Sequence, residues 1–173
     1  MNIRHSFTSE AELKSTLDWI YQQSQKGARF NSIIEVAFNE VTIITAIHNI
    51  KSNKGVNTPG IDNKKMDEYL QMDKTELIEL IQTSVRRYTP SPVKRVYIEK
   101  SNGKLRPLGL PSALDKIIQE CLKIVLEPIA EAKFFPGSYG FRPYRATKHA
   151  MKNITYLIGR KTKEKLIYAI EGD

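Results

Sequence analysis

The sequence predicts an α+β fold that is rich in helices and carries one antiparallel β-hairpin. Several segments place apolar residues at helical spacing between start and stop signals. Residues 93–110 instead alternate on either side of Asn102-Gly103, a strong hairpin signal. The short apolar run Leu166–Ile170 has the length of a buried strand. With 173 residues, the chain is long enough for one ordinary domain with a hydrophobic core.

Five helices are expected from apolar stripes and capping residues. The pattern Ser32-x-x-Glu35 resembles a capping box and opens one long helix. The strongest stripe begins at Ser112, and Pro128 is expected to kink or end that helix. The expected helices cover about residues 9–25, 32–47, 73–85, 112–129 and 146–158.

The hairpin is expected from two strands that flank a tight turn. Val93–Glu99 alternates and is rich in residues that favour strands, and Leu105–Leu110 forms the return strand. Asn102-Gly103 predicts a two-residue turn in which both central residues have positive φ. Pro107 donates no ladder hydrogen bond, so the return strand is expected at an edge or a strand end.

Positive charge is concentrated in the second half of the chain. Residues 1–85 carry 9 Lys/Arg and 11 Asp/Glu, a net charge of −2, whereas residues 86–173 carry 18 and 8, a net charge of +10. This asymmetry favours a polyanionic partner, most simply nucleic acid, over a merely solubilising surface. The single Cys121 lies in a helical stripe, and no apolar run reaches membrane-spanning length, so we expect a cytoplasmic protein that does not contact membranes.

Cations on the hairpin are candidate phosphate ligands. Lys100 and Arg106 flank the turn, and a rigid two-stranded ribbon can position two cations against a polyphosphate or a nucleic-acid backbone. Lys94 or Arg95 is a third candidate, but strand alternation lets only one of them face the same site. The alternative is that these side chains are simply solvated.

The segment FFPGSYGFRPYR, residues 134–145, predicts a loop that combines aromatic rings with arginines. Phe141 and Tyr144 could stack on bases, while Arg142 and Arg145 could hold backbone phosphates. The alternative is that the phenylalanines fill the core, which we expect for Phe134 or Phe135.

Two further loop patterns have weaker interpretations. In residues 51–62, the backbone amides at the glycines and the side chain of Lys54 could approach a phosphate, or the segment is an ordinary surface loop. Gly137-x-x-Gly140 also fits the GxxG loop of a KH-like RNA-binding module, but the expected order of elements does not match that fold.

Three ordered motifs resemble the reverse transcriptases encoded by bacterial group II introns, also called maturases. They are YIEKSNGKLRPLGLPSALDKIIQECL, SYGFRPYRATKHAM and the upstream NKGVNTPGID. Glu171-Gly172-Asp173 resembles the start of the family's third block. The resemblance covers about residues 45–173 and does not include the first 40 residues.

The resemblance implies a part of a right-hand polymerase. Residues 1–50 would be an N-terminal helical extension, residues 51–165 the fingers, and residues 166–173 the first strand of the palm, truncated. We therefore expect the chain to be a fragment cut inside a larger domain, and the severed palm surface is expected to allow self-association.

The resemblance also implies an RNA-directed DNA polymerase that assists intron splicing and mobility. Its partners would be intron and template RNA, a DNA primer and the incoming deoxynucleoside triphosphate. Lys100 and Arg106 match positions that contact the triphosphate, and Asp173 matches one of the carboxylates that bind catalytic Mg²⁺.

One carboxylate cannot build a two-metal site, so the 173-residue chain is predicted to be inactive by itself and not to bind Mg²⁺ stably. The alternative function is a non-enzymatic RNA-binding splicing cofactor, in which the basic surface only holds intron RNA.

Overall fold

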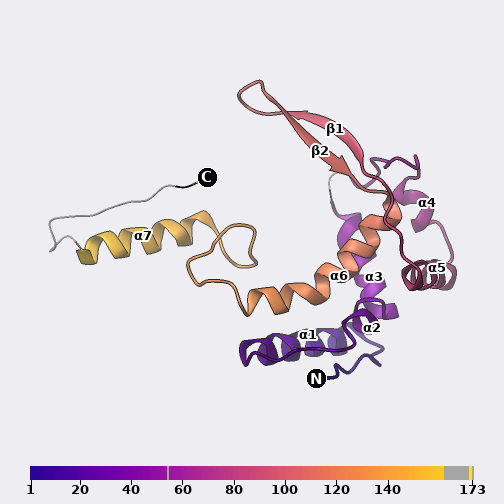
Figure 1. Cartoon of the computed structure of the whole chain (residues 1–173), viewed down its shortest axis with the longest axis horizontal. Helices are drawn as coiled ribbons and strands as arrows, with labels where there is room; N and C mark the ends of the chain where they lie inside the picture. The colour runs from indigo at the N-terminus through magenta and orange to yellow at the C-terminus, as the bar shows by residue number, and fades with distance from the viewer. Residues whose placement is uncertain (54, 162–171, 173) are drawn as a thin grey trace. The chain divides into compact units, whose positions relative to one another are not determined.

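The computed structural model describes residues 1–53, 55–161 and 172, and its fold is α+β as predicted (Figure 1). Within these described residues helices dominate, and the strands form a single two-stranded antiparallel sheet. In chain order the elements are α1 (Glu10–Gln25), α2 (Ile33–Ala37), α3 (Glu40–Lys51), α4 (Met66–Leu70), α5 (Lys74–Arg86), β1 (Lys94–Glu99), β2 (Leu105–Leu110), α6 (Ala113–Glu131) and α7 (Thr147–Lys161).

The chain divides into two compact units, Met1–Ala132 and Lys133–Asp173. The first unit contains α1 to α6 and the hairpin, and α7 belongs to the second. Helices α1, α2 and α3 all contact α6. The assignment of these parts to fingers and palm stays a prediction.

Helix α6 forms the centre of the first unit's core. Its side chains Ile117, Ile118, Cys121 and Val125 are all buried. Each large apolar side chain that is fully buried contributes roughly 1.5–3 kcal/mol to folding. Burial raises the pKa of the Cys121 thiol to about 12, so this residue is a neutral core side chain at physiological pH.

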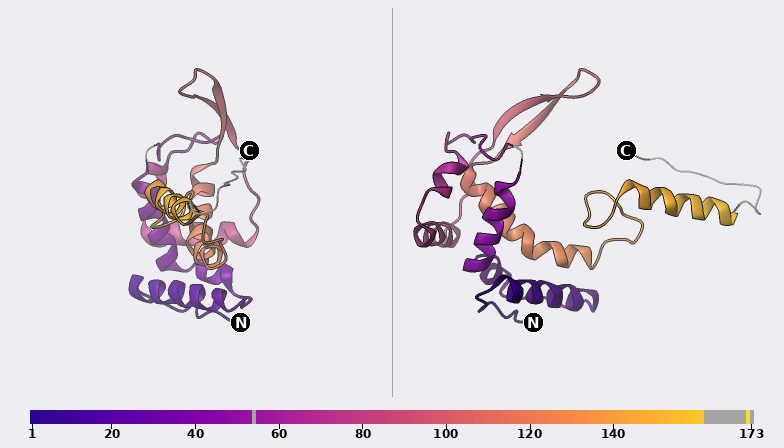
Figure 2. Two further views of the ribbon diagram at one scale, coloured as in Figure 1. Left: turned by 90° about the vertical axis from the view of Figure 1, so that its left-hand side faces the viewer. Right: turned by 180° about the vertical axis from the view of Figure 1, so that it is seen from behind.

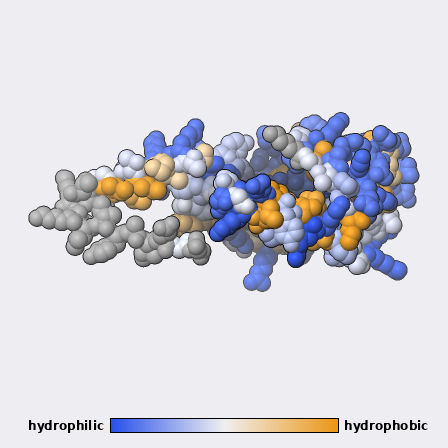
Figure 3. Space-filling model, turned by 90° about the horizontal axis from the view of Figure 1, so that it is seen from above, coloured by the Kyte–Doolittle hydropathy of each residue, from blue (hydrophilic) through white to orange (hydrophobic). Residues whose placement is uncertain are grey.

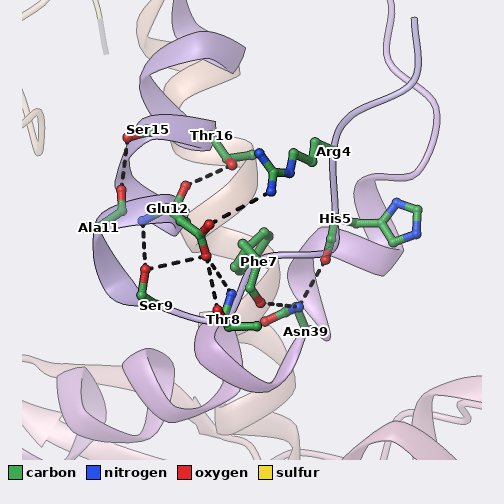
Figure 4. Close-up of polar contacts among 10 residues, drawn as sticks. All are labelled: Arg4, His5, Phe7, Thr8, Ser9, Ala11, Glu12, Ser15, Thr16 and Asn39. Carbon is green, nitrogen blue, oxygen red and sulfur yellow. Dashed lines mark hydrogen bonds and ion pairs between the residues drawn. The ribbon is translucent and has the colours of Figure 1, made fainter.

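A side-chain cap fixes the start of α1, at the beginning of the helix predicted over residues 9–25. Ser9 is the N-cap residue, and its hydroxyl accepts a hydrogen bond from the Glu12 amide at 3.3 Å. The Glu12 carboxylate reaches back to accept from the Thr8 amide at 2.8 Å, as the dashed lines in Figure 4 show. This backbone hydrogen bond is the main cause of the lowered pKa of Glu12.

The single helix expected from residue 32 to residue 47 is wrong, because two helices, α2 and α3, occupy this region. The predicted capping box is also absent: Ser32 has a φ of 64° and its side chain makes no capping hydrogen bond. The break between the helices lies at Asn39, whose side chain accepts from the Val41 amide at 2.8 Å and caps α3. The same side chain donates to the carbonyls of His5 and Phe7 (Figure 4).

The predicted hairpin is present and projects from the helices of the first unit in every view of Figures 1 and 2. Its turn differs from the expected two-residue form. The Lys100 amide donates to the Lys104 carbonyl at 2.8 Å, which closes a three-residue loop, and only Gly103 within it has a positive φ, of 74°. The glycine therefore supplies the left-handed residue of a type I turn with a bulge, and Asn102 needs no unusual backbone.

The remaining helices follow their predicted starts. Asp73 caps α5 and Ser112 caps α6, whereas the short α4 has no counterpart in the prediction. Helix α6 does not end at Pro128 but continues to Glu131. The expected strand Leu166–Ile170 lies outside the described residues. None of the helices in the described ranges has the length and apolar character needed to cross a lipid bilayer.

Candidate nucleic-acid interface

The register of the hairpin separates its cations onto two faces. Ile98 pairs with Arg106, and side chains of directly paired residues share a face. Lys94 lies four positions before Ile98 on the same strand and therefore shares that face. Arg95 pairs with Gly109 and lies on the opposite face. Of the two candidates that the sequence left open, Lys94 is the one on the same face as Arg106.

Lys100 continues the same alternation at the end of β1. Its backbone is hydrogen-bonded to Lys104 across the turn, two positions beyond the pair of Ile98 and Arg106. The hairpin carries five cations against the single acid Glu99, and all five are exposed: Lys94, Arg95, Lys100, Lys104 and Arg106. None of the five forms an ion pair with any residue in the described part of the chain.

A buried carboxylate anchors the hairpin at its base. Asp115 is only 4% exposed and accepts from the Tyr88 hydroxyl at 2.6 Å, the Ser112 hydroxyl at 2.7 Å and the Ser91 amide at 3.3 Å. Burial and the hydrogen bond to Asp115 raise the pKa of Tyr88 to about 12, so the phenol remains a donor at physiological pH. Asp115 thereby joins the segment before β1 to the helix after β2.

The loop of residues 51–62 is packed on the start of α6. A Cβ atom on Gly60 would lie 2.8 Å from the Ser112 Cα, so this position requires glycine. The Lys116 ammonium donates to the Thr58 carbonyl at 2.8 Å, and burial lowers the pKa of Lys116. Gly60 is therefore used for backbone packing, and Lys54, the predicted phosphate ligand of this loop, lies outside the described residues.

A cavity of about 490 Å³ lies between this loop, α6 and the end of β2. Both lysines in its lining have partners: Lys123 pairs with Glu120 at 3.2 Å, and Lys116 binds the loop carbonyl. The hairpin cations have no such partners among the described residues, so the hairpin is the better candidate for an anion site.

In the second unit, Arg142 is held by the loop in which it lies. Its Nη1 atom donates to the carbonyls of Phe135 and Ser138 at 3.0 and 2.9 Å. Its guanidinium carbon also lies 5.1 Å from the centroid of the Phe134 ring, a cation–π distance. The guanidinium group thus connects three parts of the loop.

Arg145 makes a similar but looser set of contacts. Its Nη1 atom donates to the Pro136 carbonyl at 3.4 Å, and its guanidinium carbon lies 5.5 Å from the centroid of the Tyr139 ring. Both arginines therefore stabilise the loop, and their predicted contact with phosphate stays a prediction.

The expectation that Phe134 or Phe135 fills the core is wrong. Phe134 is 48% exposed and Phe135 is 76% exposed. The ring of Phe134 instead lies against the Arg142 guanidinium, and the Phe135 carbonyl accepts from the same group. Both residues help to shape the loop, because the planar guanidinium group of an arginine can pack on a ring and donate hydrogen bonds to carbonyls at the same time.

Two aromatic residues of the loop combine full exposure with a left-handed backbone. Phe141 has a φ of 56° and Tyr144 a φ of 57°, and their side chains are 112% and 98% exposed. A bulky residue at positive φ is a genuine outlier and destabilises the fold by about 1–2 kcal/mol. The loop thus presents two rings to solvent at a cost to its own stability.

Helix α7 carries positive charge where helix stability favours negative charge. Its first turn has no acidic residue and contains Lys148, and Lys152 follows one turn later on the same side. Residues 133–161 include Lys or Arg at seven positions and no Asp or Glu. The Ala146 amide donates to the His149 ring at 3.2 Å, so this histidine accepts the hydrogen bond that a Glu or Gln side chain accepts in a capping box.

Helix α7 also exposes an apolar row, visible at the left of Figure 3. Its members Met151, Ile154 and Leu157 are between 48% and 60% exposed. Elsewhere in that view hydrophilic residues cover much of the surface of the first unit.

Asp173, the predicted catalytic and metal-binding carboxylate, lies outside the described residues. Over residues 1–53, 55–161 and 172 there is no group of three or more His, Cys, Asp or Glu side chains that could hold a metal ion.

The sequence analysis does not predict the anchor at Asp115 or the caps at His149 and Asn39. Nothing in the sequence signals that Tyr88, 27 residues away, donates to Asp115. The position of His149 three residues after Ala146 was a usable signal for its capping role.

Comparison with known proteins identifies the relatives of this chain. It is 41% identical over 129 residues to Protein YkfC of Escherichia coli K12, covering 70% of this chain and 32% of that protein. It is 42% identical over 129 residues to the group II intron-encoded protein LtrA of Lactococcus lactis, covering 74% and 20%. A 91 kDa protein in the cob intron of Schizosaccharomyces pombe is 29% identical over 160 residues, covering 88% and 20%.

The chain is therefore related to the group II intron-encoded proteins, and the resemblance drawn from its motifs is confirmed. It spans 20% to 32% of the length of these three relatives. A scan against models of known protein families finds no match.

Proposed function

We propose that this chain binds RNA and the incoming nucleotide as the fingers of a group II intron-encoded RNA-directed DNA polymerase that assists splicing. The observation that carries the proposal is the set of exposed cations on the anchored hairpin, which form no ion pair with the described residues. Its support is the relationship to the LtrA protein, whose name states that a group II intron encodes it.

The hairpin face with Lys94, Lys100 and Arg106 is the proposed site for phosphate groups, both those of the incoming triphosphate and those of an RNA backbone. An arginine offers a planar fork that can bind two phosphate oxygens, and a lysine offers a mobile point charge. The three cations come from both strands and the turn of one anchored ribbon, so their spacing is set before a ligand arrives. Such preorganisation reduces the entropy lost on binding.

The second unit is a further proposed site for template or intron RNA. Its basic composition from residue 133 to residue 161 favours a polyanion, and its exposed rings suit bases. DNA primer is a further proposed partner of the intact protein.

Mg²⁺ would supply charge stabilisation for nucleotidyl transfer in the intact protein, and Asp173 is the proposed ligand from this chain. The described residues do not fit a metal centre, because they bring no three suitable side chains together. We propose that the 173-residue chain alone does not extend a primer.

The proposal is tested by titrating the full 173-residue chain into fluorescently labelled single-stranded RNA and into a fluorescent deoxynucleoside triphosphate. The double variant Lys100→Glu, Arg106→Glu is expected to weaken both interactions at least tenfold, because it removes two phosphate contacts and adds two repulsive charges. The matched control is Lys14→Glu, Lys26→Glu, which changes the net charge equally on exposed positions of the first 26 residues.

Equal losses in the two double variants would show that net charge alone governs binding, and the proposal would fail. Circular dichroism verifies that the hairpin variant remains folded.

A splicing cofactor without polymerase activity is the second candidate, since exposed cations serve RNA binding equally well. The nucleotide titration separates the two. An enzyme requires the Lys100→Glu, Arg106→Glu pair to lower triphosphate affinity, whereas a pure cofactor shows the loss for RNA alone.

A further inference from the structure

We propose that Phe141 and Tyr144 each stack on an unpaired base, so that the second unit selects single-stranded over fully paired RNA. This inference rests on the proposed function, in which the second unit binds RNA. The recognised feature of the RNA is then its unpaired bases. The rings contact these bases, and the arginines hold the loop in shape.

The two rings have an unusual conformation. Both side chains are almost entirely in solvent, and both backbones are left-handed. The Arg145 amide donates to the Arg142 carbonyl at 3.3 Å across a turn with Pro143 second and Tyr144 third. The third position of such a turn with positive φ normally holds glycine or asparagine, because a side chain there is strained. Folding gains nothing from an exposed tyrosine at this position.

The two arginines already bind groups of the loop itself. Arg142 binds two backbone carbonyls and the Phe134 ring, and Arg145 binds one carbonyl and the Tyr139 ring. They are therefore positioning residues that hold the loop in shape. A rigid loop presents Phe141 and Tyr144 in a fixed conformation, which lowers the entropy lost when a base binds.

The charge around the rings favours a polyanionic partner. Exposed aromatic rings could also bind a protein, but residues 133–161 contain no acidic side chain and many basic ones. Lys148 and Lys152 follow the rings on one side of α7 and are the proposed phosphate contacts of this unit. Cations beside exposed rings are the combination that binds single strands, in which base faces are accessible. In a paired duplex those faces are stacked and hidden.

The test measures binding of the full 173-residue chain to three RNAs of equal length: a single strand, the same strand with its bases removed, and a blunt duplex. For Phe141→Ala, Tyr144→Ala, we expect single-strand affinity to fall at least about fivefold for each ring removed. Affinity for the abasic strand and the duplex should not change. The slope of log affinity against log salt should also stay the same, because no phosphate contact is lost.

Matched variants separate stacking from misfolding. Tyr21→Ala removes an exposed tyrosine from α1 and should have no effect. The pair Phe141→Trp, Tyr144→Phe keeps both rings and should restore single-strand affinity. Arg142→Lys keeps the charge but loses the paired donation to the loop carbonyls, so it should reduce the preference for single strands without changing the salt slope.

The outcomes distinguish this inference from the function on which it rests. If the wild-type chain binds none of the three RNAs, the proposed function fails. If it binds all three equally and the alanine pair changes nothing, RNA binding stands and the stacking role is overturned. The stacking role is also overturned if the alanine pair weakens binding to the abasic strand as much as to the intact strand.

Discussion

Neutralising the hairpin cations one at a time tests whether the ribbon uses a single face. Lys94 and Arg106 lie on one face, and Arg95, the next residue after Lys94, lies on the other. Lys94→Gln and Arg106→Gln should each weaken RNA binding, whereas Arg95→Gln should leave it nearly unchanged. The three substitutions have the same effect on net charge, so any difference between them reports geometry.

The expected magnitude follows from the release of counterions. Each phosphate contact on a single strand contributes a slope of about 0.7 in log affinity against log salt. Lys94→Gln and Arg106→Gln should each reduce that slope by about 0.7, and the double variant by about 1.4. Raising the salt concentration from about 50 mM to 200 mM lowers the RNA affinity of the wild-type chain. For each phosphate contact that is lost, this fall in affinity should be about 2.6-fold smaller.

The assay is fluorescence anisotropy with labelled single-stranded RNA over a series of salt concentrations. Thermal melts followed by circular dichroism establish that each variant is folded. A slope for Arg95→Gln that falls as far as that for Lys94→Gln would refute the single-face reasoning. An unchanged slope for both Lys94→Gln and Arg106→Gln would show that the hairpin does not touch phosphate.

Three further predictions concern stability. Tyr88→Phe removes a hydrogen bond to the buried Asp115, so the free energy of unfolding should fall by about 1–2 kcal/mol in urea titrations, and a value unchanged from wild type would contradict the anchor. Tyr144→Gly relieves a left-handed tyrosine and should raise that free energy by about 1 kcal/mol while weakening RNA binding; a loss of stability would contradict the strain. The amides of Thr75 and Glu76 lower the pKa of Asp73 below its ordinary value of 3.8. The Asp73 carboxylate therefore contributes to stability above pH 3.8, and this contribution is lost as the pH falls through the lower pKa of the folded state. Asp73→Asn should therefore narrow the difference in stability between neutral and acidic pH, and an equal acid loss in both proteins would argue against this role.

Local signals predicted most elements of the fold because their causes are local. Ser9, Asp73 and Ser112 each cap a helix within the next three residues, and Gly103 fixes the turn of the hairpin. The break at Asn39 was missed because its side chain is also used by the carbonyls of His5 and Phe7, more than 30 residues away in sequence. A continuous apolar stripe cannot reveal a partner of that kind.

The candidate site was predictable in composition but not in geometry. Strand alternation requires Lys94 and Arg95 to lie on opposite faces of the hairpin. Only the observed pairing of Ile98 with Arg106 shows that Lys94, and not Arg95, shares the face of Arg106. Likewise, the sequence displays Arg142 as a free cation, whereas the fold gives its guanidinium group to loop carbonyls. Residue type indicates what a side chain can bind, and tertiary contacts decide what it does bind.

The anchor at Asp115 has a mechanical consequence. Each hairpin strand has six residues and is therefore about 20 Å long, so a tilt of about 5° at its base would displace the tip by about 2 Å. Displacements near 1 Å are enough to disturb a reacting geometry. The side chains that hold the base of the hairpin thus determine how accurately Lys100 and Arg106 are positioned, although none of those side chains needs to contact the ligand.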